Sequence, residues 1–101
     1  MAKLDCLAVL KAVSEPNRVR ILRLLLKEKL GVNEVAHRLE LSQYNVSKHL
    51  RILRQAGLLE VEKWGKQRFY HIPPLFRTRL AQQGRCLKLD CCTLHFDRLC
   101  Q

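Results

Sequence analysis

Apolar side chains recur at spacings of three and four residues through the first half of the chain, a pattern that predicts a series of short helices. The first, over 4–13, is apolar around much of its circumference, so we expect it to be buried in the core or against a second subunit. The second covers 16–27, with Ser14 as its N-cap and Pro16 in its first turn. Its polar face is left for solvent or phosphate and contains Arg18, Arg20, Arg23 and Lys27.

A pair of helices joined by a short turn follows. A helix over about 33–39 is separated by Leu41 and Ser42 from a longer helix that covers about 43–56. Ser42 is the predicted N-cap of the longer helix, and Gly57 is its C-terminal stop. The side chains expected to face the core from this helix are Val46, Leu50 and Leu53.

The hydrophobic period changes from helical to alternating beyond the last of these helices. Residues 59–64 alternate between apolar and polar side chains, and 68–72 is rich in strand-forming types, with a basic, glycine-containing turn between them. This arrangement predicts a β-hairpin. A further helix is expected over about 74–84. The predicted fold is therefore mainly α, with about five helices and a two-stranded β-hairpin in one domain over 1–84, followed by a separate cysteine-rich tail over 85–101.

Length and charge narrow the class of partner. With 101 residues, the chain has room for one domain and is too short for a multi-domain enzyme. Its formal net charge of +10 predicts a polyanionic partner, either a nucleic acid or an anionic membrane surface. The sequence contains no apolar run of the ~18–20 residues that a membrane span needs, and its first residues do not resemble a secretory signal. We therefore expect a cytoplasmic protein without a membrane partner, and a domain this small gains buried surface by dimerising.

Two helices joined by a short turn and followed by a basic hairpin form a winged helix-turn-helix. The second helix of such a unit enters the major groove, where glutamine and asparagine pair with adenine, lysine pairs with guanine, and hydroxyl groups contact phosphate or base. The side chains predicted to contact DNA are Gln43, Tyr44, Asn45, Ser47, Lys48 and Arg51 on this helix, and Lys63, Lys66 and Arg68 on the hairpin. The alternative is an amphipathic helix whose polar face is only solvated. For His49, which lies beside Leu50, we expect a packed, hydrogen-bonded ring rather than a phosphate contact.

Three segments resemble the ArsR/SmtB family of repressors. They are 14–22 (SEPNRVRIL), 41–58 (LSQYNVSKHLRILRQAGL) and 64–70 (WGKQRFY), and the resemblance covers about 4–84. It implies a homodimeric winged-helix repressor whose first and last helices build the dimer interface. It also implies a pseudo-palindromic operator in double-stranded DNA, from which the repressor is released by a metal, a metalloid or a thiol-modifying signal.

Two sensor sites that the family resemblance suggests are absent from this sequence. One is a Cys-x-Cys box in the helix before the recognition helix, and residues 32–39 contain no cysteine. The other is a carboxylate and histidine zinc site on the last helix, and residues 74–84 contain no Asp, Glu, His or Cys. Zinc sensing of that kind is therefore not expected.

The cysteines are distributed unevenly. Of five, Cys6 lies near the start and the other four crowd the C-terminal tail. Thiolates are soft ligands that select thiophilic ions, and trivalent arsenic needs only three sulfur atoms. The tail also resembles that of ArsR-like arsenical sensors with an adjacent cysteine pair, which implies trivalent arsenic as the inducer and no organic cofactor. The expected ligands are Cys91, Cys92 and Cys100, with Cys86 in reserve and Cys6 added if the first helix lies beside the tail.

Other roles for the tail cysteines stay open. Their basic neighbours favour thiolate chemistry, so a redox switch that forms a disulfide or persulfide is the main alternative. The order Cys-Cys-x-x-His that ends at His95 suggests zinc, although this is not a standard structural zinc spacing. A packing role as small buried hydrophobes is the remaining alternative. An enzyme is not expected, because the sequence has no Cys-x-x-Cys motif and no histidine and aspartate spaced to activate a nucleophile.

Overall fold

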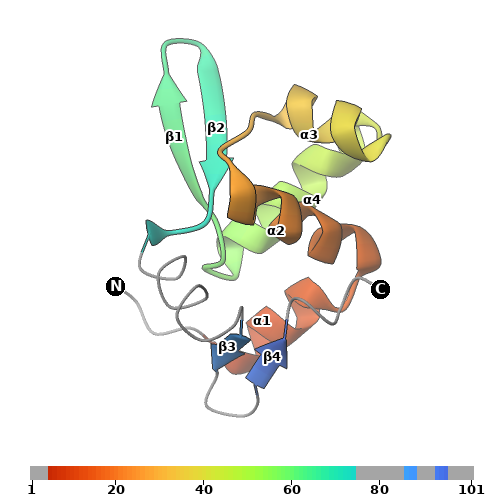
Figure 1. Ribbon diagram of the computed structural model, residues 1–101, viewed down its shortest axis with the longest axis vertical. Helices are drawn as coiled ribbons and strands as arrows, with labels where there is room; N and C mark the ends of the chain where they lie inside the picture. The colour runs from red at the N-terminus through yellow and green to blue at the C-terminus, as the bar shows by residue number, and fades with distance from the viewer. Residues whose placement is uncertain (1–4, 75–85, 89–92, 96–101) are drawn as a thin grey trace.

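The computed structural model describes residues 5–74, 86–88 and 93–95. In this part of the chain, four helices precede a β-hairpin, and two short strands lie near the C-terminus. The elements are α1 (Cys6–Val13), α2 (Pro16–Lys27), α3 (Val32–Leu39), α4 (Gln43–Gln55), β1 (Glu60–Trp64), β2 (Gln67–His71), β3 (Cys86–Lys88) and β4 (Thr93–His95). The hairpin of β1 and β2 projects from one end of the helices, and α1, β3 and β4 lie at the other end (Figure 1). The predicted mainly α winged helix-turn-helix is therefore confirmed.

The start of α2 differs from the prediction in its capping residue. Ser14, the predicted N-cap, instead ends α1, and its hydroxyl donates a 2.7 Å hydrogen bond to the Lys11 carbonyl. Pro16 occupies the first position of α2, so the N-cap is the residue immediately before it. That residue is Glu15, whose carboxylate accepts from the Arg18 N–H at 3.0 Å. The prediction for Ser14 is wrong because α2 begins at Pro16, which places Glu15 rather than Ser14 at the N-cap.

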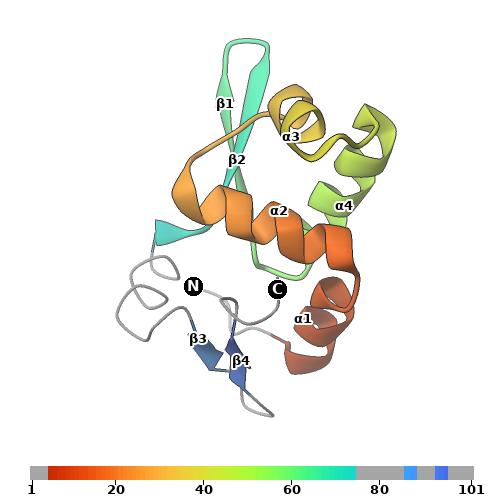
Figure 2. The ribbon, with the colours of Figure 1, turned by 45° about the vertical axis from the view of Figure 1, so that its right-hand side comes forward.

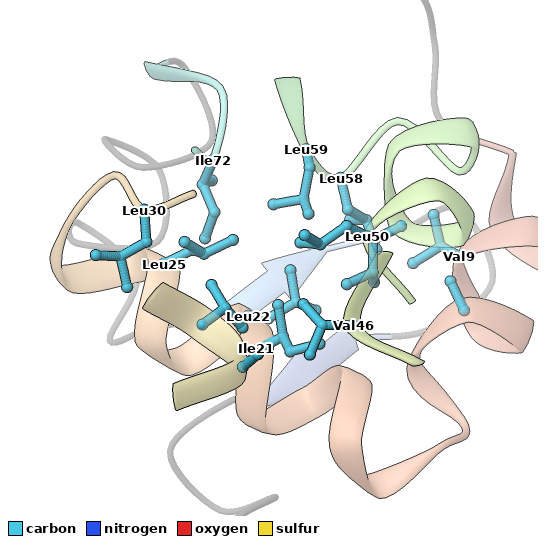
Figure 3. Packing of buried hydrophobic residues seen from close by; sticks show 14 residues of the cluster. Val9, Ile21, Leu22, Leu25, Leu30, Val46, Leu50, Leu58, Leu59 and Ile72 are labelled. Carbon is cyan, nitrogen blue, oxygen red and sulfur yellow. The ribbon is translucent and has the colours of Figure 1, made fainter. Parts of the chain in front are cut away.

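One hydrophobic core joins the four helices to the base of the hairpin (Figure 3). The stripe predicted for α4 is confirmed, since all three of its side chains are fully buried. The first helix is buried on one face, through Val9 and Ala12, whereas its Leu7 is 68% exposed. The core cluster consists of Val9, Ala12, Ile21, Leu22, Leu25, Leu30, Val35, Ala36, Val46, Leu50, Leu53, Leu58, Leu59 and Ile72.

The β1–β2 hairpin is attached to the helices at its base. The strands are antiparallel, and Gly65 adopts a φ of 63° in the turn between them. Tyr70 of β2 and Leu30 exchange two backbone hydrogen bonds, of 2.8 and 3.2 Å. A Cβ at Gly31 would lie 3.2 Å from the Arg68 carbonyl oxygen, so glycine lets β2 approach the start of α3 closely. These contacts fix the position of the hairpin beside α3.

Two short strands occupy part of the tail for which the sequence pattern predicted no element. β3 and β4 are antiparallel, with Cys86 opposite His95. Leu94 of β4 is partly buried and packs against the core, and both views of the ribbon place these strands beside α1 (Figure 2). Beyond Pro74, the predicted fifth helix lies outside the described residues. Of the helices in the described part, none is long and apolar enough to cross a membrane.

Candidate nucleic-acid interface

The helix α4 has one face in the core and one polar face in solvent. Its buried stripe holds the helix in one rotational setting, so the polar face is turned outward. All six side chains that the sequence predicted to contact DNA from this helix are exposed, Tyr44 to 77%. They are Gln43, Tyr44, Asn45, Ser47, Lys48 and Arg51. Exposed side chains over the first turns of a helix are what base reading in a major groove requires.

The turn that precedes α4 is short and well bonded. Glu40 ends α3 in the left-handed conformation, with a φ of 57°. The N–H groups of Glu40 and Leu41 donate to carbonyls in the last turns of α3, at 3.4 and 3.0 Å. Ser42 then begins α4 as predicted, because its Oγ accepts a 3.1 Å hydrogen bond from the Asn45 N–H. This turn fixes the angle between the two helices of the helix-turn-helix.

The hairpin carries its cations close to the start of α3. Lys63 lies opposite Arg68 across the two strands, Lys66 lies in the turn, and all three side chains are exposed. A groove of about 550 Å³ between the hairpin and α3 is lined in part by Asn33, Lys66 and Arg68. Lysine, arginine and asparagine side chains are among the usual protein ligands of DNA phosphates.

The predicted DNA contacts keep their charges available. Elsewhere, Lys29 pairs with Glu62 at 2.8 Å, and Arg38 pairs with Glu28. Within the described ranges, no carboxylate pairs with the cations of the polar face and hairpin, which are Lys48, Arg51, Lys63, Lys66 and Arg68. Unpaired cations release counterions when they neutralise phosphates, which is the main source of affinity for DNA.

Arg18 has a role that the sequence did not suggest. It was expected to face solvent or phosphate, and this prediction is wrong because the side chain is partly buried. Its Nε donates to the Ala12 carbonyl at 2.5 Å and its Nη2 to the Lys11 carbonyl at 3.4 Å, since the last carbonyls of α1 lack partners within the helix. Its Nη1 lies 3.3 Å from Nδ1 of His49 in α4. The His49 side chain is only 15% exposed, so the predicted packed and hydrogen-bonded ring is confirmed.

Trp64 is a second side chain that sequence reasoning did not assign to the interface. It is the only tryptophan in the sequence, it ends β1, and it is 64% exposed. Lys63 precedes it in β1, Gln67 lies opposite it in β2, and Lys66 lies in the turn between the strands. Exposed aromatic side chains are typical of binding surfaces. The sequence signal for placing Trp64 at the interface is its position directly before a basic turn.

The carboxylate of Glu62 ties β1 to the connection between α2 and α3. The hydrogen bond from Lys29 holds the pKa of Glu62 below its ordinary value of 4.5, although desolvation acts in the opposite direction. The positive charges of Lys29 and His71 lower this pKa further, and the Trp64 side chain has a smaller effect in the same direction. The pair of Lys29 and Glu62 thus anchors the hairpin to the connection between α2 and α3.

Of the five cysteines, the described residues include Cys6 and Cys86. Cys6, at the start of α1, is disulfide-bonded. All other cysteines of the sequence lie at position 86 or later, so a bond within one chain connects α1 to the C-terminal segment. The predicted arsenic ligands Cys91, Cys92 and Cys100 lie outside the described residues, and Cys86 begins β3. Across the described part, no three His, Cys, Asp or Glu side chains are grouped as a metal site.

Comparison with known sequences identifies the same helices. Residues 15–61 match the family of bacterial regulatory proteins described as arsR. The transcriptional activator HlyU of Vibrio cholerae is 44% identical over 62 residues, which are 61% of this chain and 57% of HlyU. The arsenic resistance transcriptional regulator ArsR1 of Pseudomonas putida is 39% identical over 67 residues, 65% of this chain and 52% of ArsR1. The chain thus spans about half the length of these curated relatives.

Solved structures agree with this assignment. The structure of HlyU from Vibrio cholerae has a TM-score of 0.66 and 35% identity, and the match covers 78% of this chain and 87% of that chain. A structure of reduced HlyU has a TM-score of 0.63 and 34% identity, over 76% of this chain and 85% of that chain. The named relatives are transcriptional regulators rather than enzymes. Together with the winged helix-turn-helix and its exposed recognition helix, these matches show that the chain belongs to the ArsR family of bacterial DNA-binding transcriptional regulators.

Proposed function

We propose that this protein is a repressor that binds double-stranded operator DNA as a homodimer and leaves it when its cysteine thiols react or bind a thiophilic ion. One observation supports the DNA-binding surface above all. The full set of polar and basic side chains predicted for it, on α4 and on the hairpin, is exposed, while the opposite face of α4 is fixed in the core. Because its target is the genome, the proposal places the protein in the cytoplasm.

In this proposal, α4 occupies the major groove. Gln43 and Asn45 face base edges, where an amide side chain pairs with adenine, and Lys48 and Arg51 reach guanine or phosphate. The hairpin cations contact the adjacent backbone or minor groove. Base contacts then supply sequence preference, and phosphate contacts supply most of the affinity.

A homodimer places two copies of α4 on one face of the duplex. Successive major grooves are ~34–36 Å apart, so a two-fold symmetric dimer fits a pseudo-palindromic site. Dimerisation through α1 would bury Leu7, which is 68% exposed.

Substitution on α4 tests the DNA-binding surface. Lys48→Ala and Arg51→Ala are each expected to weaken binding about 5- to 150-fold, because a good contact contributes about 1–3 kcal/mol. Binding is measured by fluorescence anisotropy with a duplex that the protein selects from a random library, and circular dichroism verifies the fold. Lys27→Ala is the matched control, since it removes an exposed cation from α2 outside the interface. Equal losses for all three variants would contradict the assignment of α4.

Trivalent arsenic is the first candidate for the signal. The thiols of Cys91, Cys92 and Cys100 would replace the three hydroxyl groups of arsenous acid as ligands, and each hydroxyl would leave as water with one thiol proton. The similarity to a regulator named for arsenic resistance supports this candidate. A variant with Cys91→Ser and Cys92→Ser is then expected to bind operator normally and to stay bound when arsenite is added.

A disulfide switch is the second candidate, and the bonded state of Cys6 favours it. Two thiols lose two protons and two electrons to hydrogen peroxide, which is reduced to two water molecules. A dithiol reverses the step by forming its own disulfide. Disulfides of proteins that work in a reducing compartment are usually transient or redox-sensing, which suits a regulator.

Two titrations of operator affinity separate these candidates. Arsenite added to reduced protein without oxygen raises Kd in the wild type and in Cys6→Ser if arsenic is the signal. Peroxide added without arsenite raises Kd in the wild type but not in Cys6→Ser if the disulfide is the signal. A Kd that neither reagent changes would refute control by thiols and leave the DNA-binding assignment standing.

A further inference from the structure

We infer that Arg18 is a positioning residue that couples α1, together with the bond at Cys6, to the recognition helix α4. The inference rests on the proposed function, because it concerns how affinity for operator DNA is set. It is supported by the contacts of a single guanidinium group, which reaches from the first turn of α2 to both α1 and α4.

The guanidinium holds the C-terminal end of α1. Two of its N–H groups donate to the carbonyls of Ala12 and Lys11, at 2.5 and 3.4 Å. The Ser14 hydroxyl donates to the same Lys11 carbonyl at 2.7 Å. Cys6 lies at the opposite end of α1, and a hydrogen-bonded helix of eight residues moves as a short rod. A displacement imposed at Cys6 is therefore felt at the carbonyls that Arg18 binds.

The same guanidinium holds the middle of α4. Its Nη1 is 3.3 Å from Nδ1 of His49, and since a guanidinium only donates, Nδ1 is the acceptor. The ring proton then belongs on Nε2, which faces the Glu15 carboxylate at 3.7 Å. Glu15 also accepts from the backbone N–H of Arg18 at 3.0 Å. The histidine ring is thus held between an arginine and a glutamate that both belong to the start of α2.

The hydrogen bonds at this junction are partly buried and depend on direction. The side chains of His49 and Glu15 are 15% and 31% exposed, and Leu50 beside the ring is fully buried. Apolar contacts between α1 and α4 have no preferred direction and tolerate small sliding movements. Hydrogen bonds depend on distance and angle, so the Arg18 contacts fix the setting of α4 relative to α1.

The consequence for DNA binding follows from the position of the histidine. His49 directly follows Lys48 and lies two residues before Arg51, which are both predicted DNA contacts. A movement of α1 that shifts Arg18 therefore moves the histidine and, with it, the exposed face of α4. Removing the guanidinium leaves the DNA contacts in place and disconnects them from the state of Cys6.

The ratio of two operator affinities tests the inference. Kd is measured for the disulfide-bonded protein and for the same protein reduced with dithiothreitol, with a duplex that the reduced protein selects from a random library. The wild-type ratio is expected to be about 5 to 150, the usual range for coupling between two sites. In Arg18→Ala and in His49→Ala it is expected to approach one, and the double variant adds nothing further because both residues act through one contact.

Arg20→Ala is the matched control, since it removes the same charge from the same helix. Arg20 donates to Asn17 and to the Leu39 carbonyl, so its loss touches neither α1 nor α4, and the wild-type ratio is expected. If Arg18→Ala does not fold, the pair His49→Ala and His49→Asn decides, because asparagine keeps an acceptor near the position of Nδ1 and restores part of the ratio.

A wild-type ratio in Arg18→Ala or His49→Ala would overturn the inference, as would a wild-type protein whose ratio is one. Failure of the proposed function looks different. In that case the reduced wild-type protein selects no duplex at all from the library.

Discussion

Single polar side chains connect elements that apolar packing alone leaves free to slide. Glu15 and Ser42 each satisfy a backbone N–H at a helix start, and Arg18 satisfies carbonyls at a helix end. Each has a defined partner at hydrogen-bond distance, so its contribution is local and can be removed without opening a cavity in the core. The stability of the recognition helix is therefore open to test one residue at a time.

Ser42→Ala is expected to lower the free energy of unfolding by about 1 kcal/mol, because the Asn45 N–H loses its acceptor at the start of α4. Urea denaturation followed by circular dichroism measures the change. Ser47→Ala, in the exposed part of the same helix, is the control and is expected to leave stability unchanged or slightly raised, since alanine favours helix. An equal loss in both variants would argue against the cap.

The Glu62 carboxyl is expected to titrate in an NMR experiment with a midpoint below 4.5, and to move back toward that value in Lys29→Met. A carboxyl whose pKa is lower in the folded than in the unfolded state stabilises the fold above the unfolded pKa. That contribution is lost as the pH falls through the folded pKa, so the free energies of unfolding of the wild type and of Lys29→Met converge in acid. A midpoint that does not change in Lys29→Met would show that another group lowers the pKa.

At the scale of elements, agreement between independent signals decided which parts of the sequence predicted structure correctly. For α4, the apolar stripe, the Ser42 cap and the Gly57 stop all indicated the same boundaries, and Gly57 adopts the expected positive φ. The N-cap of α2 was predicted at Ser14, whereas the structure places it at Glu15, directly before Pro16. Alternation and a glycine turn were likewise sufficient for the hairpin.

Removing the hairpin cations tests the wing as an element. Lys66→Ala combined with Arg68→Ala is expected to reduce the slope of log K against log salt concentration by about 2, because each phosphate contact contributes about 0.9. Anisotropy titrations at several salt concentrations give the slope, and Lys27→Ala is expected to keep the wild-type value. Trp64, the only tryptophan, reports on the same element, since its fluorescence should change when a duplex is added. A wild-type slope in the double variant would exclude the hairpin from the interface.

At the scale of the whole molecule, contacts between residues far apart in the sequence could not be predicted from local patterns. Arg18 lies on the polar face of an amphipathic helix, and nothing in its local sequence shows that His49, which is 31 positions away, lies beside it. For Cys6, the sequence predicted a role with the tail cysteines only if the first helix lies beside the tail, and the structure shows it bonded to a cysteine far along the chain. Periodicity and capping describe contacts within a few residues, so they predict helices and strands but not the junctions between them.

The most direct measurement of the central claim is operator affinity in the presence and absence of free thiols. Wild-type protein and a variant with all cysteines changed to serine are titrated with the selected duplex, first reduced, then after peroxide and after arsenite in separate samples. We predict that at least one reagent raises the wild-type Kd about 5- to 150-fold and that the serine variant stays bound throughout. A wild-type Kd that is the same in all three samples would contradict the account.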